Sequence, residues 1–186
     1  MLKKVSDWIH HVSKGWVAFS ATVIFLLFTA LVLPAQSSKV ESGESSVGSP
    51  DLSFFYSADD LYQMAEAYGQ EGREAYIRVR FTFDLIWPLV YVLFLCTGIS
   101  WVYGKAFSPD SLWQRMNLVP VLAALFDYLE NIATSLVMQQ YPAQLPIVAG
   151  LAPIFTMAKW MLVGGSFVLL IVGVVVGGWR WLKKGR

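Results

Sequence analysis

A small group of ionisable residues lies inside otherwise apolar stretches of the sequence, and these residues are the ones that could do chemistry. Asp84 falls in one stretch, Asp127 and Glu130 in the next, and Lys159 in the last. An ionised side chain at the centre of a bilayer costs about 2.5–3.5 kcal/mol on insertion scales, so each needs a partner. Arg80, four residues before Asp84, predicts an ion pair on one helix face. Lys159 is predicted to pair with Glu130 or Asp127 across two helices.

Helical spacing gathers more polar side chains around these charges. We predict a ligand-binding set of Arg80, Asp84, Tyr91, Asp127, Glu130, Asn131 and Lys159. If a reaction is catalysed, the candidate catalytic residues are Glu130, Asp127 and Lys159. Three acids against two bases leave one carboxylate in excess, which suits proton handling or the capture of a cationic group. The alternative is structural, because salt bridges between helices also lock a small bundle together.

Several other kinds of chemistry lack the residues they need. The single cysteine, Cys96, excludes a disulfide within the chain. Both histidines, His10 and His11, precede the first apolar stretch, which excludes a bis-histidine haem site across a bilayer, and we expect both to be solvated. No Gly-x-Ser-x-Gly, His-Glu-x-x-His or P-loop motif occurs. We predict no cofactor and no nucleic-acid partner.

A metal site is also not expected. The alternative would be a site made of carboxylates alone, from Asp84, Asp127 and Glu130.

The composition indicates that lipid is the main solvent of this chain. Of the 186 residues 56% are hydrophobic and 15% are charged, whereas soluble domains carry about 25% charged residues. Since one crossing needs about 20 apolar residues, we predict an all-α, polytopic four-transmembrane-helix bundle, with residues 1–186 as a single membrane domain. The predicted spans cover about residues 16–34, 77–104, 115–139 and 153–181.

The long connection between the first two spans, residues 35–76, is predicted to lie outside the membrane. Residues 35–50 are typical of a flexible tether. A short amphipathic helix is expected at 58–69, with Ser57 as its N-cap, and a second helix should run from Glu71 straight into the second span, bent at Pro88. The last span should begin at Pro153, after a turn at the outer interface.

Basic residues indicate the orientation. Lysines precede the first span, Lys105 and Arg115 flank the second connection, and four basic residues lie between Arg180 and the C-terminus, whereas the first connection is rich in acids. The positive-inside rule then places both termini in the cytoplasm. We expect a multi-pass protein of a bacterial plasma (inner) membrane, with the first span a retained anchor rather than a cleaved signal peptide.

The function predicted from these residues is binding of a lipid-like or small amphiphilic ligand, or of a partner membrane subunit, at the buried charged cluster in the outer half of the bilayer. The alternatives are an intramembrane lipid-modifying enzyme with Glu130 or Asp127 as acid/base, an accessory subunit of a larger membrane complex, and a proton- or ion-coupled carrier. Membrane lipid is the expected partner in every case.

A four-span bundle with buried acids is broadly similar to the sterol-isomerase and sigma-2-receptor superfamily. The resemblance implies a pocket that holds an amphiphilic amine or a sterol-like cation between acidic residues. The similarity lies in the architecture, and the long connection after the first span departs from that superfamily.

Overall fold

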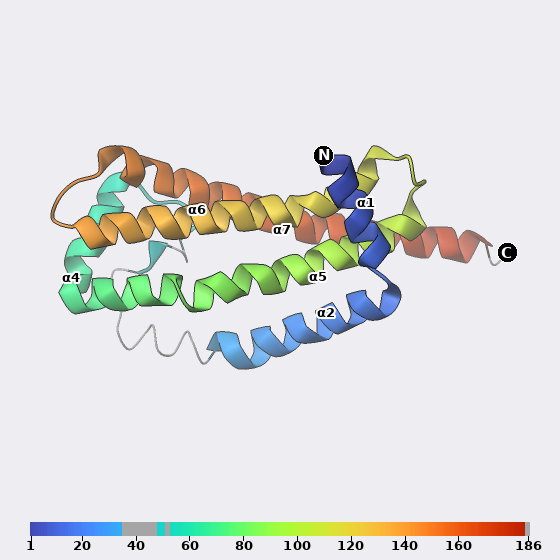
Figure 1. The fold of residues 1–186 in the computed structure, drawn as a ribbon, viewed down its shortest axis with the longest axis horizontal. Coiled ribbons are helices and arrows are strands. Elements are labelled where there is room, and N and C mark those ends of the chain that lie inside the picture. Colours follow the sequence, from blue (N-terminus) through green and yellow to red (C-terminus); the bar gives the residue numbers. More distant parts are fainter. Residues whose placement is uncertain (35–47, 51–52, 185–186) are drawn as a thin grey trace. The chain divides into compact units, whose positions relative to one another are not determined.

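The computed structural model describes residues 1–34, 48–50 and 53–184, and within them the chain is helical, with no strand. Four stretches are long and apolar enough to cross a membrane: Gly15–Val32, Ala58–Ala106, Leu112–Gln140 and Pro146–Lys183. The elements in chain order are α1 Leu2–Val12, α2 Gly15–Leu27, the π-helical η1 Phe28–Val32, α4 Ala58–Arg80, α5 Phe83–Ala106, the 3-10 helix η3 Leu112–Leu118, α6 Val119–Gln140 and α7 Pro146–Lys184 (Figure 1).

The chain divides into two compact units, and α5, α6 and α7 each contribute to both. Unit 1 comprises Met1–Phe28, Val90–Leu122 and Leu162–Arg186. Unit 2 comprises Thr29–Leu89 and Ala123–Met161. The single membrane domain over residues 1–186 stays a prediction.

In unit 1, aromatic rings and a close helix approach join α2, α5 and α7. The Phe25 ring stacks on Phe94, with centroids 4.5 Å apart, and both rings contact Phe167. Further along α7, a Cβ atom built on Gly173 would lie 2.5 Å from Cε1 of Tyr103. The Tyr103 hydroxyl also donates to the carbonyl of Leu169, at 3.0 Å. The absence of a side chain at Gly173 therefore lets α7 lie directly against the Tyr103 ring.

In unit 2, α4 packs on the ends of α6 and α7 that lie nearest the α6–α7 connection. A buried apolar cluster made by these three helices and Tyr56 comprises Tyr56, Leu61, Met64, Ala65, Tyr68, Tyr76, Ala133, Val137, Met138, Ala149 and Ala152. Ser57 caps α4 in a capping box with Asp60, as its sequence position predicts. Gly69 interrupts the helix with φ 62° and ψ −175°, a conformation essentially limited to glycine. The guanidinium of Arg73 donates to the Ala65 carbonyl, at 2.9 Å, and so bridges the interruption.

Three predictions about the helices need correction. The helix that begins after Gly69 does not run straight into α5, because α4 ends at Arg80 and α5 starts at Phe83. The Thr82 hydroxyl donates to the Arg78 carbonyl and so satisfies the end of α4. The last helix begins at Pro146 rather than Pro153: Pro146 has no N–H to leave unpaired in the first turn, and α7 continues through Pro153.

The third correction is α1, a helix over residues 2–12 that the sequence analysis did not predict. The expected tether falls largely on residues 35–47, outside the described residues.

The close approach at Gly173 can be tested with a matched pair of glycine substitutions. Gly173→Ala should lower the free energy of unfolding by about 1–3 kcal/mol, because the added methyl group overpacks the contact with Tyr103. Gly164→Ala, at an α7 position where a Cβ would meet no atom within 4 Å, should be neutral or stabilising. Thermal unfolding of the purified protein in detergent measures both, and equal effects of the two variants would contradict this packing.

Candidate functional site

A buried ion pair in unit 2 joins α6 to α7. The Lys159 ammonium nitrogen lies 2.5 Å from Oε2 of Glu130 and 3.7 Å from Oδ1 of Asp127. Lys159, Glu130 and Asp127 are 4%, 1% and 5% exposed. The predicted pairing of Lys159 is thus confirmed, with both acids rather than one, and Glu130 is the closer partner.

A second buried ion pair lies at the junction between α4 and α5. Nη1 of Arg80 is 2.6 Å from Oδ2 of Asp84, as the four-residue spacing predicts. On its other side the guanidinium lies over the Tyr76 ring, 4.5 Å from the centroid. An arginine can bind a carboxylate and stack on an aromatic face at once because its charged group is planar. The sequence analysis did not assign Tyr76 to the site, although it lies four residues before Arg80 on the same face of α4.

The neighbours of α6 show which way its polar residues point. Glu130 faces α7 through Lys159, whereas the Tyr128 hydroxyl donates to the Leu85 carbonyl of α5, at 3.0 Å. At about 100° per residue these two side chains leave α6 roughly 160° apart. Asp127 and Asn131 fall on the buried arc between them. The interior side of α6 between its contacts to α5 and α7 is therefore polar.

Two buried polar atoms on this arc have no hydrogen-bond partner within the described part of the chain. They are Nδ2 of Asn131 and Oγ of Ser135, whose residues are each 4% exposed. Asp127, Asn131 and Ser135 follow one another at four-residue intervals and so form one stripe along α6. An unsatisfied buried polar group costs about 1–3 kcal/mol. The stripe therefore offers hydrogen-bonding capacity that the described residues do not use.

The formal charge of the buried cluster is negative. Three buried acids, Asp84, Asp127 and Glu130, stand against two buried bases, Arg80 and Lys159, which leaves −1. Burying a charge in apolar surroundings costs several kcal/mol unless an opposite charge compensates it. Asp127 lies farther from the Lys159 ammonium than Glu130 does, at 3.7 Å against 2.5 Å.

Apolar and aromatic residues close the cluster on the side of α4. The Tyr56 hydroxyl lies 3.0 Å from the Thr156 hydroxyl, one turn from Lys159 on α7. Backbone N–H of Leu145, just before α7, donates to the Tyr62 hydroxyl at 2.8 Å. These bonds hold the start of α4 and the segment before it against the first part of α7, and the Tyr56 contact lies one turn from Lys159.

Tyr91 is buried, at 3% exposure, and belongs to unit 1; its place in the ligand-binding set stays a prediction. No set of three His, Cys, Asp or Glu side chains in the described residues is placed to hold a metal ion, so the three acids of the alternative metal site do not converge as ligands.

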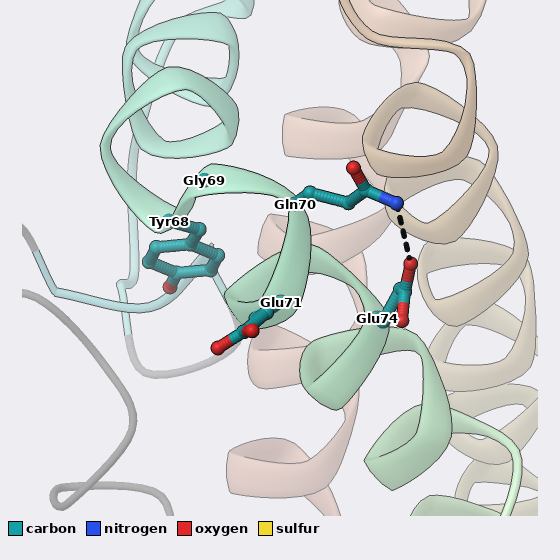
Figure 2. A pocket seen from close by; sticks show the side chains of 5 residues that line it. All are labelled: Tyr68, Gly69, Gln70, Glu71 and Glu74. Carbon is teal, nitrogen blue, oxygen red and sulfur yellow. Dashed lines mark hydrogen bonds between the residues drawn. The ribbon is translucent and has the colours of Figure 1, made fainter.

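A surface hollow lies elsewhere, at the interruption of α4. Figure 2 shows it lined by Tyr68, Gly69, Gln70, Glu71 and Glu74, with the Gln70 amide donating to the Glu74 carboxylate at 3.1 Å. It contains none of the buried charged residues.

Unit 1 contains an uncharged polar network that the sequence analysis missed. Its centre is Asn117 in η3, which is fully buried. The Asn117 amide donates to the Ser6 carbonyl and to the Ser100 hydroxyl, and its Oδ1 accepts from the Ser6 hydroxyl. The Cys96 thiol donates to the Asn117 carbonyl. This network ties α1 to α5 and η3.

His10 belongs to the same network, so the expectation that it is solvated was wrong. Its Nε2 lies 2.8 Å from the Gln114 carbonyl and its Nδ1 lies 3.2 Å from the Ser100 carbonyl. A carbonyl oxygen only accepts, so the ring nitrogen that carries the proton is the donor in these contacts. His11, its neighbour, is exposed as predicted.

Comparison with known proteins gave no match to any protein-family model, curated protein or solved structure.

The buried ion pairs predict a large penalty for removing Lys159. Lys159→Met should lower the free energy of unfolding by about 3–5 kcal/mol, because Glu130 and Asp127 then remain buried without a countercharge. The double variant Lys159→Met/Glu130→Gln should recover part of this loss. Lys105→Met, which removes an exposed lysine of α5, is the control and should change stability little. A Lys159→Met effect no larger than that of the control would contradict the pairing.

The His10 contacts predict that this residue fastens α1. His10→Ala should speed amide hydrogen exchange across Leu2–Val12 by roughly tenfold, because the hydrogen bonding of the ring to these carbonyls, worth about 0.5–1.5 kcal/mol per bond, is lost. Exchange measured by mass spectrometry on the whole protein reports this directly. The exposed His11→Ala is the matched control, and equal exchange in the two variants would show that His10 does not hold the helix.

Proposed function

We propose that this protein crosses a bacterial plasma membrane four times, as a helical bundle with both termini in the cytoplasm, and binds the headgroup of a lipid-like amphiphile at the cluster in unit 2. The four apolar stretches and the distribution of basic residues support the membrane arrangement. In that arrangement the cluster lies in the outer half of the bilayer, reachable from the outer leaflet.

The observation that carries the proposal is the stripe on α6. Nδ2 of Asn131 and Oγ of Ser135 are buried without hydrogen-bond partners in the described residues, one and two turns along α6 from the acid Asp127. Salt bridges that only lock helices together do not require these two atoms. A headgroup with a positively charged group beside a hydrogen-bond acceptor fits this stripe, because a carboxylate attracts the cation and the Asn131 amide donates to the acceptor.

The interruption of α4 at Gly69 supports entry of such a headgroup. Gly69 divides α4 into two helical parts, and the first part packs in the apolar cluster with α6 and α7. Glycine at an element boundary can absorb the backbone rotation that a moving segment requires. We infer that the first part of α4 moves when the amphiphile enters, and that its acyl chains then lie along the apolar surface of α7.

Native mass spectrometry of protein extracted in mild detergent, with lipid analysis of the bound species, tests the proposal. Wild-type protein should carry one amphiphile. Asp127→Asn should reduce its occupancy about tenfold or more, because a hydrogen bond to a charged group contributes about 1.5–3 kcal/mol.

Two further variants separate the competing explanations. Asn131→Leu should also reduce occupancy, whereas Glu71→Gln, in the surface hollow of Figure 2, should not. Loss of the amphiphile only in Glu71→Gln would move the site to the hollow. Wild-type protein with no bound amphiphile would make the cluster structural and overturn the proposal.

The same spectra distinguish the other functions considered for these residues. A second polypeptide in place of a lipid would indicate an accessory subunit. Conversion of the bound lipid by wild-type protein, lost in Glu130→Gln, would indicate a lipid-modifying enzyme.

A further inference from the structure

Helix α1 has three different faces, and one of them packs on the rest of unit 1. Ser6, Ile9 and Ser13 are buried at 1%, 9% and 5% exposure. Ser6 and the neighbouring His10 hold this face through Gln114 and Asn117 of η3. The docked face fixes the rotation of α1 about its own axis, so the direction in which every other residue of the helix points is determined.

The second face is apolar and exposed. Val5, Trp8 and Val12 are 42%, 64% and 36% exposed, and at about 100° per residue they leave the helix within roughly 60° of one another. This strip is separate from the docked face. Large apolar side chains aligned in this way on a helix that is already anchored require an apolar medium on that side.

The third face is polar and positively charged overall. Lys3, Lys4, Asp7 and His11 are all exposed on it. Over residues 1–15 three lysines stand against one acid, a net charge of +2 with the histidines neutral. A basic polar face beside a strip of Trp and Val is typical of helices that lie in a membrane interface and bind anionic lipids.

The direction of α1 agrees with such a position. Within unit 1, α1 runs across the direction of α2, which begins three residues after α1 ends (Figure 1). A helix crosswise to a spanning helix lies in the plane of the membrane. The apolar exposed surface also continues into the first turns of α2, where Trp16 and Phe19 are 70% and 71% exposed.

We propose that α1 lies in the plane of an anionic phospholipid surface, with Val5, Trp8 and Val12 inserted among the acyl chains and Lys3, Lys4 and Lys14 on the lipid phosphates. The inference rests on the membrane insertion of α2 proposed above, and is independent of the amphiphile site in unit 2. The hydrogen bonds of Ser6 and His10 fix the rotation of α1 about its axis, and the docked face thereby determines which side of the helix meets the lipid.

Spin labels on the two exposed faces test this orientation. Single cysteines replace Trp8 or Val5 on the apolar strip, and Lys4 or His11 on the polar face, in a Cys96→Ser background that keeps a donor to the Asn117 carbonyl. The whole protein is reconstituted in vesicles of phosphatidylcholine with phosphatidylglycerol. Labels at positions 5 and 8 should collide more often with oxygen than with a water-soluble nickel chelate, and labels at positions 4 and 11 should show the reverse.

A label at Phe19 of α2 distinguishes the in-plane position of α1 from the membrane insertion of α2. A lipid-exposed label there, with positions 5 and 8 as open to the nickel chelate as positions 4 and 11, overturns the in-plane helix alone. A water-exposed label at Phe19 overturns the membrane insertion on which it rests. Since Val5→Cys and Trp8→Cys report on the same strip, failure of one variant to fold leaves the other decisive.

The anionic lipid is tested by removing either partner of the charge interaction. In vesicles of phosphatidylcholine alone, or with Lys3→Gln/Lys4→Gln in the mixed vesicles, the label at position 8 should become several-fold more accessible to the nickel chelate. Each lysine removed should shift the equilibrium between the inserted and the water-exposed strip by about fivefold, from about 1 kcal/mol per basic residue near an anionic surface. No change in either case would overturn the role of the anionic headgroups.

Discussion

The ammonium group of Lys159 needs a countercharge before the apolar residues around it can pack, and much of unit 2 follows from that requirement. Glu130 and Asp127 supply the charge from α6, so the axial register of α6 against α7 is set by an ion pair rather than by shape alone. Breaking such a pair costs more than forming it gains, because the remaining charge stays buried. The contact is therefore an exacting constraint on how these helices pack.

Unit 1 also satisfies its buried polar groups, but it does so with uncharged partners. Asn117 is fully buried, yet both ends of its amide are hydrogen-bonded, and the bonds hold α1 against η3 and α5. The network of unit 1 is satisfied at its centre, whereas the stripe of unit 2 retains two buried polar atoms, on Asn131 and Ser135, without hydrogen-bond partners among the described residues. That difference is why we assign ligand binding to unit 2 and anchoring of α1 to unit 1.

Together the two proposals give the chain two kinds of contact with lipid. The amphiphile site would use charge and hydrogen bonds inside apolar surroundings, where each is strong because water is absent. Helix α1 would use a broad apolar strip and lysines at the surface, where each contribution is small and several add up. The first favours selectivity for a headgroup, and the second favours a fixed position relative to the bilayer surface.

The sequence by itself determined the apolar helices, the capping box of α4 and the pairs Arg80–Asp84 and Lys159–Glu130/Asp127, because hydropathy, local spacing and the cost of an unpaired charge act on residue types alone. It did not determine that α7 starts at Pro146 or that His10 is held, since both depend on neighbours far along the chain: Ala149 and Ala152 pack in the cluster under α4, and His10 meets the carbonyls of Ser100 and Gln114. Tertiary structure alone also showed that Asn131 and Ser135 lack partners in the described residues. A polar side chain becomes a candidate binding group only when packing buries it and leaves it unsatisfied.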